Sequence, residues 1–219
     1  APSSVQEMAD FVKLAFDLAF KYRNPTMILT DGAIGQMMEK VELEEQIPRL
    51  TDAEVKEKFP WATTGKNPDQ ERTIVTSLEL DSAKQEQVNL RLQAKYREIE
   101  KKEVRFEEIQ CEDADYILVA YGTSSRLCQK TIQLAREKGL KVGLFRPITL
   151  YPFPVKQIQE LAQRVKGFLS VEMSAGQMIE DIRLAVGCDI KVDHFGRFGG
   201  IIPSPEEILE ALEQKIIGG

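Results

Sequence analysis

The chain of 219 residues is poor in the residue types that build metal centres and disulfides. It has three cysteines and one histidine, and no Cys-x-x-Cys pair occurs. Structural zinc sites and iron–sulfur clusters use clustered cysteine and histidine ligands, so we expect neither within this chain. We interpret the widely spaced Cys111, Cys128 and Cys188 as reduced thiols of a cytoplasmic protein.

The chain also lacks the sequence features of several other classes of protein. No apolar run approaches the roughly 20 residues of a membrane span, and the first residues lack the basic segment and apolar core of a signal peptide. A formal net charge of −6 argues against a nucleic-acid-binding surface. The chain also lacks a Gly-x-Gly-x-x-Gly motif, which makes a nicotinamide-dependent oxidoreductase a distant alternative.

The chain begins with the pattern of an amphipathic helix. Ser4 and Glu7 have the spacing of a capping box, and apolar residues then recur at steps of three and four. This predicts a helix to about Tyr22, which Asn24-Pro25 ends.

A ligand-binding loop is predicted next. The apolar run 26–30 predicts a strand that delivers Asp31 and Gly32 into a loop with a second glycine, Gly35. Ligands of α/β proteins often lie at such strand ends. One helix and one strand cannot bury their own apolar faces, so we expect the other walls of the site elsewhere.

The middle of the chain, residues 46–110, predicts a connector. It carries three prolines and the single tryptophan, Trp61, without a sustained period. Within it, residues 82–106 predict a highly charged helix with a thin apolar stripe. Either a solvated helix or a helix that reaches a partner subunit fits this composition.

Residues 111–219 predict a complete α/β domain. Apolar runs at 116–120, 141–146, 168–172 and 190–193 alternate with amphipathic segments, the last of which follows Ser204. This alternation predicts a parallel sheet with helices on both faces. Thr123 or Ser124 is the expected N-cap of the first helix, and Gly139 is expected at its C-terminal end.

Three further places in this domain are candidate sites. Gly122, Thr123, Ser124 and Arg126 follow a strand and open a helix, where backbone N–H groups can meet an anion. Helix capping alone also accounts for the two hydroxyl residues.

The other two places lie near the chain's later strands. Glu172, with Ser174 and Gly176 after it, is either a general base or an acceptor that holds its loop, and we favour the second. His194 is a possible proton shuttle, and Arg197 between glycines is a possible clamp for a carboxylate or phosphate. A glycine-rich turn before the last helix is the simpler interpretation of both.

Five segments together resemble the α subunit of 2-oxoacid:ferredoxin oxidoreductases across essentially the whole chain: "AFDLAFKYRNPTMILTDGAIGQMME", "DADYILVAYGTSSR", "KVGLFRPITLYPFP", "VEMSAGQMIEDIR" and "PSPEEILEAL". The stretch "DGAIGQMME" is most similar to the 2-oxoisovalerate (branched-chain) enzymes. Relatives that act on 2-oxoglutarate tend to carry a histidine where Gln36 stands.

The resemblance implies a domain division. Residues 1–45 resemble the C-terminal end of a thiamine diphosphate pyrimidine-binding domain whose earlier part is not in this sequence, so we expect a fragment. Residues 111–219 resemble the C-terminal domain of transketolase.

The chemistry that it implies belongs to an assembly. Thiamine diphosphate with Mg²⁺ would lie between α and β subunits, with iron–sulfur clusters and coenzyme A on other subunits or domains, and none bound to this fragment. The implied partners are the β subunit, the iron–sulfur (γ and δ) subunits and, through the complex, ferredoxin. Oxidative decarboxylation of a branched-chain 2-oxoacid to acyl-CoA is the expected activity, and the isolated fragment is expected to be inactive.

The resemblance also names a substrate-proximal loop, with Asp31, Gly32, Gly35, Gln36 and Met37 nearest the 2-oxoacid. Two alternatives remain open: a 2-oxoglutarate:ferredoxin oxidoreductase α subunit, and a non-catalytic subunit-assembly module with a transketolase C-terminal fold.

Overall fold

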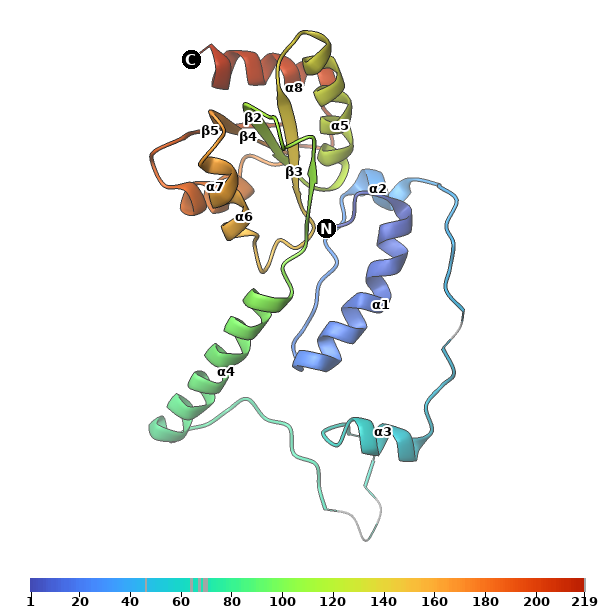
Figure 1. Cartoon of the computed structure of the whole chain (residues 1–219). Coiled ribbons are helices and arrows are strands. Elements are labelled where there is room, and N and C mark those ends of the chain that lie inside the picture. The colour runs from blue at the N-terminus through green and yellow to red at the C-terminus, as the bar shows by residue number, and fades with distance from the viewer. Residues whose placement is uncertain (46, 64, 67, 69–70, 219) are drawn as a thin grey trace. The chain divides into compact units, whose positions relative to one another are not determined.

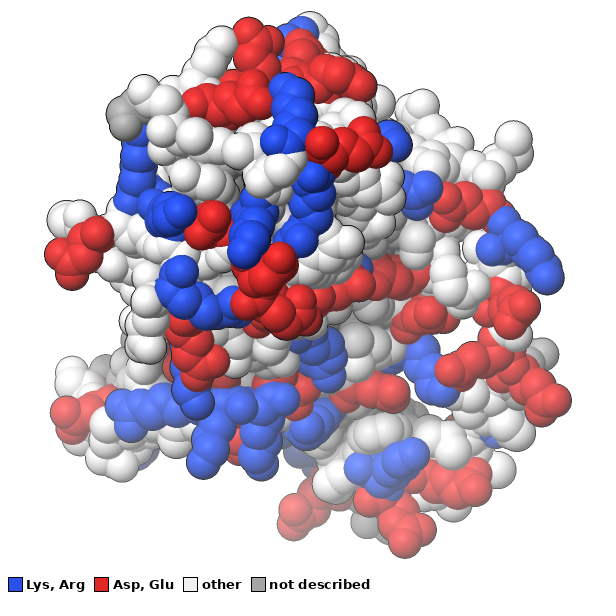
Figure 2. Space-filling view, turned by 45° about the horizontal axis from the view of Figure 1, so that its top comes forward, with Lys and Arg blue, Asp and Glu red and all other residues white. Residues whose placement is uncertain are grey.

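The computed structural model describes residues 1–45, 47–63, 65–66, 68 and 71–218 (Figure 1). Contacts divide the chain into two units, residues 1–42 with 95–219 and residues 43–94. Among the described residues, no helix is both long and apolar enough to cross a membrane. Lys and Arg side chains are interspersed with Asp and Glu on the face shown in Figure 2, so neither sign dominates it.

The smaller unit holds little regular structure. Its helix α3 (Asp52–Lys58) starts with a reciprocal capping box, in which Thr51 and Glu54 each accept from the other's backbone N–H. Trp61 makes an edge contact with Phe59, with ring centroids 6.0 Å apart. The charged helix α4 (Ser82–Lys102) begins in this unit and ends in the larger one.

A five-stranded sheet organises the larger unit, with the strand order β1-β3-β2-β4-β5. Four strands are parallel to one another and lie on the predicted apolar runs, which confirms the α/β prediction: β2 (Tyr116–Ala120), β3 (Val142–Pro147), β4 (Gly167–Glu172) and β5 (Lys191–Gly196). The fifth, β1 (Phe106–Ile109), pairs antiparallel with β3 at the sheet edge. This antiparallel edge strand was not predicted, and it makes the sheet mixed.

Helices cover both faces of the sheet, as predicted (Figure 1). One core lies under α5 (Gly122–Glu137) and α8 (Pro205–Leu212), and the other lies under α6 (Val155–Ala162) and α7 (Met178–Val186). Side chains alternate along each strand, so Leu118 enters the first core while Ile117 enters the second. Ser204 caps α8 in a reciprocal capping box, and a π-helical turn (Glu213–Ile217) follows α8.

Strand β1 was not predicted, because it is short and carries two glutamates. Its first residue, Phe106, was assigned to the charged helix and residues 107–109 to the connector. An edge strand needs a partner on one side only, so charged residues are tolerated there. Glu107 lies opposite Arg146 of β3 and accepts from its guanidinium at 2.9 Å, while Phe106 stacks on Phe145. These partners lie far along the chain, so no local pattern reveals them.

Helix α1 (Val5–Tyr22) has its predicted bounds and ends at Arg23, which has a left-handed backbone with φ of 46°. Ser4 accepts from the backbone of Glu7. The carboxylate of Glu7 accepts from Ser3 and also from Arg146, whose side chain is only 4% exposed. The buried Arg146 therefore connects α1 to the C-terminal end of β3.

Residues 26–30 are extended but are not a strand, so that prediction is wrong. A strand needs a neighbour for its backbone groups, and within the described residues no β-ladder includes this segment. Met27 and Leu29 are exposed while Ile28 and Thr30 are partly covered, which is the alternation of a strand face. The following loop is also not irregular, because residues Gly32–Gln36 form a short helix, α2.

The close approach of the chain at Gly143 yields a testable prediction. A Cβ atom at Gly143 would lie 2.7 Å from the carbonyl oxygen of Gln110 and 3.0 Å from Cα of Cys111. Since both are backbone atoms, Gly143→Ala should lower the free energy of unfolding by roughly 1–3 kcal/mol, the usual cost of overpacking. Urea unfolding of the chain measures this.

Gly32→Ala serves as the control. A Cβ atom there would meet nothing within 4 Å, and the position is the first of helix α2. This substitution should leave stability unchanged or slightly higher, since alanine favours helices over glycine. Equal losses for both variants would contradict the assignment of a close approach at Gly143.

Candidate functional site

The carboxylate of Asp31 lies at the start of two helices. Its Oδ1 accepts from the backbone N–H groups of Ala33 and Ile34, both at 3.0 Å, and so caps α2. Its Oδ1 also accepts from the Thr123 hydroxyl, and its Oδ2 from the Thr123 backbone N–H, both at 2.8 Å. Thr123 belongs to the first turn of α5, where the helix dipole favours a negative charge.

These contacts set the charge state of Asp31. Burial alone would raise the pKa of its carboxyl, but the hydrogen bonds from Thr123, Ile34 and Ala33 outweigh burial and lower the pKa. The group is therefore an anion held by N–H and O–H donors. The turn 122–126 was a candidate anion site, with helix capping as the alternative, and the structure places one of the chain's own carboxylates against it.

Gly122 allows this approach. It has a φ of +59°, and a Cβ atom there would lie 2.6 Å from Oδ2 of Asp31. The N-cap position of α5 is Tyr121, without a side-chain cap. The prediction that Thr123 or Ser124 caps the helix is wrong, because Asp31 supplies the acceptor from a segment distant in sequence. Gly139, with a φ of +81°, lies just beyond the C-terminal end of α5, as predicted.

The far end of the same loop is also attached to α5. Arg126 forms an ion pair with Glu39 at 2.9 Å and donates to the backbone oxygen of Ser3 at 3.1 Å. Glu39 also accepts from the backbone N–H of Val5 at 3.1 Å. Arg126 was one of the candidate anion-site residues, and in the structure it pairs with this internal carboxylate.

The loop residues between Asp31 and Glu39 differ in exposure. Ile34 is 1% exposed and anchors α2, whereas Gly35 and Gln36 are exposed and Met37 is partly covered. The side chain of Met38 is 98% exposed. The structure thus presents Gln36 to Met38 on a short, anchored loop beside the N-terminus of α5.

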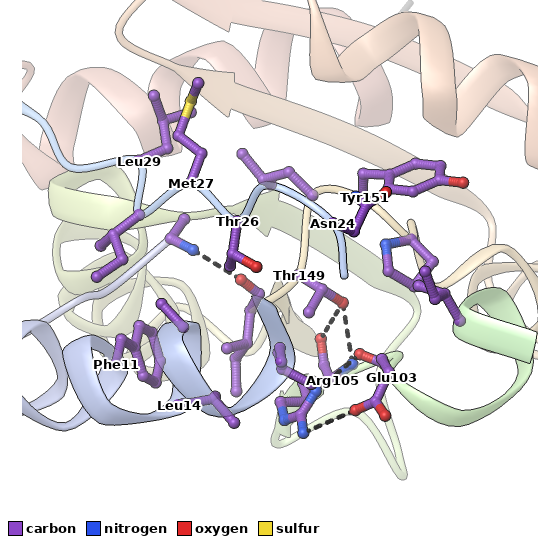
Figure 3. A pocket seen from close by; sticks show the side chains of 18 of the residues that line it. Phe11, Leu14, Asn24, Thr26, Met27, Leu29, Glu103, Arg105, Thr149 and Tyr151 are labelled. Carbon is purple, nitrogen blue, oxygen red and sulfur yellow. Dashed lines mark hydrogen bonds and ion pairs between the residues drawn. The ribbon is translucent and has the colours of Figure 1, made fainter. Parts of the chain in front are cut away.

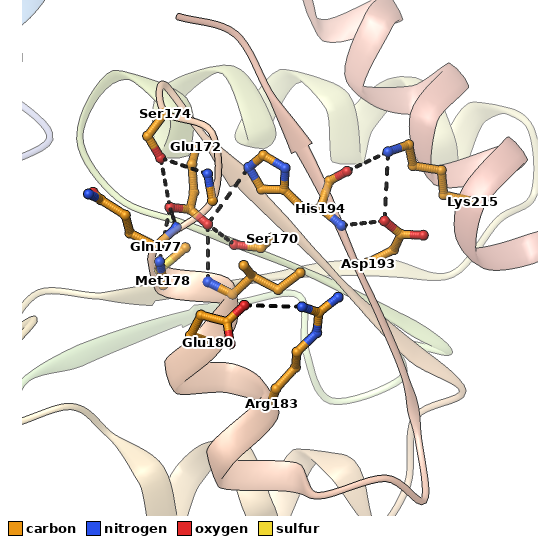
Figure 4. A network of polar contacts seen from close by, with 12 residues as sticks. Ser170, Glu172, Ser174, Gln177, Met178, Glu180, Arg183, Asp193, His194 and Lys215 are labelled. Carbon is orange, nitrogen blue, oxygen red and sulfur yellow. Dashed lines mark hydrogen bonds and ion pairs between the residues drawn. The ribbon is translucent and has the colours of Figure 1, made fainter.

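Glu172 lies at the end of β4 and is completely buried (Figure 4). Three backbone N–H groups and two hydroxyls donate to its carboxylate at 2.8–3.1 Å: Gln177, Met178 and Ile179, with Ser170 and Ser174. Burial raises the pKa of this carboxyl, but the hydrogen bonds outweigh burial and lower it. These are the contacts of an acceptor that holds the loop before α7, rather than of a base that titrates near neutrality.

His194 and Arg197 lie on or just after β5, close to this network. Nε2 of His194 is 3.9 Å from Oε1 of Glu172, which is beyond hydrogen-bond distance, and it is buried without a hydrogen-bond partner. Arg197 pairs with Glu207 of α8 at 2.7 Å. The structure therefore brings His194 beside Glu172, but it pairs Arg197 with an internal carboxylate.

Sequence reasoning missed a cavity of about 360 Å³ beside α1 (Figure 3). Its walls are mostly apolar and come from α1, the extended segment 24–29 and the loop 148–152. Glu103 and Arg105 form a polar part of the wall. The sequence signal for an uncovered face here was the apolar run 26–30, because one helix and one extended segment cannot bury their own apolar faces.

Glu103 gives this wall a pH-dependent contact. Its carboxylate accepts from Lys21 at 2.7 Å, from the Tyr22 hydroxyl at 2.6 Å and from Arg105 at 3.1 Å. Burial would raise the pKa of Glu103, but these donors outweigh it and lower the pKa from 4.5 to about 2. A lowered pKa means that Glu103 stabilises the folded chain fully above about pH 4.5 and loses this contribution as the pH falls toward about 2.

We therefore expect Glu103→Gln to lose most stability at neutral pH. Urea unfolding of both proteins between about pH 6 and about pH 3 should show a difference that shrinks as the pH falls. The variant keeps the size of the side chain, so packing cancels in the comparison. A difference that stays constant over this range would contradict the role of the ionised carboxylate.

A second stability prediction concerns Glu172. Glu172→Gln replaces one acceptor oxygen by an NH₂ donor that faces N–H groups, so it should lower the free energy of unfolding by roughly 2–4 kcal/mol. Glu180→Gln on α7 is the control, because Glu180 is exposed and pairs only with Arg183 among the contacts described. Its effect should stay within about 0.5 kcal/mol. Similar losses for both variants would argue against the loop-holding role.

Comparison with known proteins covers almost the whole chain. Residues 1–107 match the family model "Pyruvate flavodoxin/ferredoxin oxidoreductase, thiamine diP-bdg", and residues 114–208 match "Pyruvate:ferredoxin oxidoreductase core domain II". The chain is 46% identical to ketoisovalerate oxidoreductase subunit VorB of Methanothermobacter thermautotrophicus, over 98% of this chain and 59% of the relative.

A second curated relative and one solved structure are also similar to this chain. It is 30% identical to 2-oxoglutarate synthase subunit KorA of Methanothermobacter marburgensis, over 97% of this chain and 62% of the relative. The solved structure of the 2-oxoglutarate:ferredoxin oxidoreductase from Magnetococcus marinus shares the fold, with a TM-score of 0.56 and 23% identity over 63% of this chain and 24% of that chain. The chain spans about three fifths of the length of these curated relatives.

Proposed function

Because the chain belongs to the 2-oxoacid:ferredoxin oxidoreductase family, we propose that it is part of the α subunit of such an enzyme in the cytoplasm. The proposed reaction is the oxidative decarboxylation of a branched-chain 2-oxoacid such as 2-oxoisovalerate. The 2-oxoacid and coenzyme A give acyl-CoA and carbon dioxide, and two electrons pass to ferredoxin. The β subunit and the iron–sulfur subunits of the same complex are the proposed partners.

The substrate proposal is supported by similarity and by the loop. The chain is more similar to the ketoisovalerate subunit than to the 2-oxoglutarate subunit. Gln36 is neutral, and Met37 and Met38 offer flexible apolar surface that suits a branched alkyl group. We propose Asp31 to Met37 as the substrate-proximal stretch, with Gln36 or Met37 at the side-chain end of the 2-oxoacid.

The proposed domain division gives residues 1–45 to the C-terminal end of a thiamine diphosphate pyrimidine-binding domain. Residues 46–110 are the connector and residues 111–219 the transketolase C-terminal-like domain. Two features support this division: the strand-like segment 26–30 without a ladder, and the apolar cavity next to it. We propose that the rest of the thiamine-binding domain covers this face in a protein of the relatives' length.

We propose that the thiamine diphosphate–Mg²⁺ site of the enzyme lies mostly outside this chain. Within the described residues, no three side chains of His, Cys, Asp or Glu gather as metal ligands. The cofactor supplies carbanion stabilisation when it is bound, and we assign no step of that chemistry to this chain. Its proposed contribution is one wall of the substrate pocket.

The isolated chain should therefore show no decarboxylase activity and bind thiamine diphosphate weakly at best. Calorimetry of the chain with thiamine diphosphate and Mg²⁺ tests this, with the assembled enzyme as the positive control. Stoichiometric binding in the micromolar range by the isolated chain would contradict the proposed sharing of the site.

The substrate proposal makes a prediction for Gln36. In the assembled enzyme, Gln36→His should shift the substrate preference from 2-oxoisovalerate toward 2-oxoglutarate. A protonated histidine can donate a hydrogen bond to the second carboxylate of 2-oxoglutarate, which 2-oxoisovalerate lacks. A hydrogen bond to a charged group contributes ~1.5–3 kcal/mol, so the ratio of kcat/KM values should change roughly ten- to hundredfold. Kinetics with both 2-oxoacids for both enzymes measure the ratio.

Gln36→Asn is the control, because it shortens the side chain without adding a charge. If residue 36 only packs the loop, both variants lower both activities together. An unchanged ratio for Gln36→His would reject the pocket role of this residue, and the branched-chain proposal would then rest on similarity alone.

A further inference from the structure

Both ends of the loop 31–39 are attached to one helical turn. Asp31 receives two hydrogen bonds from Thr123, and Glu39 receives an ion pair from Arg126. Thr123 and Arg126 are three residues apart on α5, so they lie on the same side of the helix. A loop held at both ends by one rigid element has fewer conformations than a loop held at one end.

The middle of the loop has a single buried anchor. Ile34 is 1% exposed, while Gly35 and Gln36 are exposed and Met38 is 98% exposed. The geometry between the anchors therefore depends on the two attached ends and on this one side chain. Gln36 and Met37 can face a substrate reproducibly only if the ends stay in place.

The contact at Asp31 depends on the identity of the residues around it. The carboxylate satisfies the first turns of α2 and α5 together, and a side chain at Gly122 would displace it. Thr123 contributes its hydroxyl and its backbone N–H to different oxygens of the carboxylate, which fixes the carboxylate's rotation.

We propose that the first turn of α5 is a clamp for the substrate loop, with Thr123 and Arg126 as positioning residues that act through Asp31 and Glu39. Its consequence for catalysis rests on the proposed function of the loop. Loosening the clamp should chiefly raise KM and reduce the discrimination between 2-oxoacids, because a pocket wall that moves binds all of them less specifically.

The first experiment needs no activity. Hydrogen exchange of the full chain reports opening of the loop through the backbone amides of residues 31–39. Thr123→Val keeps the shape but loses the hydroxyl donor, and it should accelerate this exchange roughly tenfold. Thr123→Ser keeps the donor and should restore slow exchange.

Two matched controls lie on the same helix. Thr131 is a buried threonine of α5 whose hydroxyl donates to the backbone oxygens of Leu127 and Pro205. Thr131→Val therefore loses a comparable buried hydroxyl without touching the loop and should leave loop exchange unchanged. For the second attachment, Arg126→Gln should accelerate exchange near Glu39, whereas Lys130→Gln removes an exposed charge of α5 and should not.

The second experiment measures kcat/KM for 2-oxoisovalerate and 2-oxoglutarate in the assembled enzyme. Thr123→Val should raise KM for 2-oxoisovalerate roughly tenfold and narrow the ratio between the two acids, with recovery in Thr123→Ser. Unchanged loop exchange in Thr123→Val, or equal exchange in Thr131→Val, overturns the clamp. Faster loop exchange with unchanged kinetics supports the clamp and overturns the pocket role of the loop, so the two failures are distinguishable.

Discussion

The carboxylate of Asp31 is the contact on which the arrangement of the candidate site depends. It is shared by the first turns of α2 and α5, although Asp31 and Thr123 are 92 residues apart in sequence. Each helix start has backbone N–H groups without an intrahelical acceptor, and one anion satisfies both sets. Without it, the loop that carries Gln36 would have no fixed start, and the N-terminus of α5 would need another anion.

A second internal carboxylate accepts from the N–H groups of a helix start at the end of β4. Glu172 accepts from three N–H groups at the start of α7, as Asp31 does at the starts of α2 and α5. Parallel sheets gather helix N-termini at the carboxyl ends of their strands, where external anions often bind. In this chain internal carboxylates occupy two of those positions, so the turns after β2 and β4 serve to position loops. The side chains that these loops carry are then the ones available to contact a ligand.

A feature of the fold or the candidate site could be predicted from the sequence where nearby residues determine it. It could not be predicted where residues distant in sequence determine it. The four parallel strands follow from apolar runs that are local, and the bounds of α1 follow from Ser4 and the Asn24-Pro25 pair. Strand β1 was missed because its identity depends on Arg146 and Phe145 of a distant strand. The N-cap of α5 was assigned to Thr123 or Ser124 because sequence shows only nearby hydroxyls, whereas the acceptor comes from Asp31. Asp31, Gly32 and Gly35 of the loop were named from the residue pattern, and Gln36 and Met37 from resemblance. The two attachments of the loop to α5 were not foreseen.

The polar and the apolar side chains of residues 1–42 have different surroundings. The attachments described here are polar and charged: Glu7 with Arg146, Asp31 with Thr123, and Glu39 with Arg126. Apolar side chains of the same segment, among them Phe16 and Met27, remain exposed, and others line the cavity beside α1. Charged contacts depend on direction, so they fix orientation at modest net stability, whereas apolar burial supplies stability without direction. The segment is thus oriented by the sheet domain, while its apolar face stays available for the covering domain that we propose.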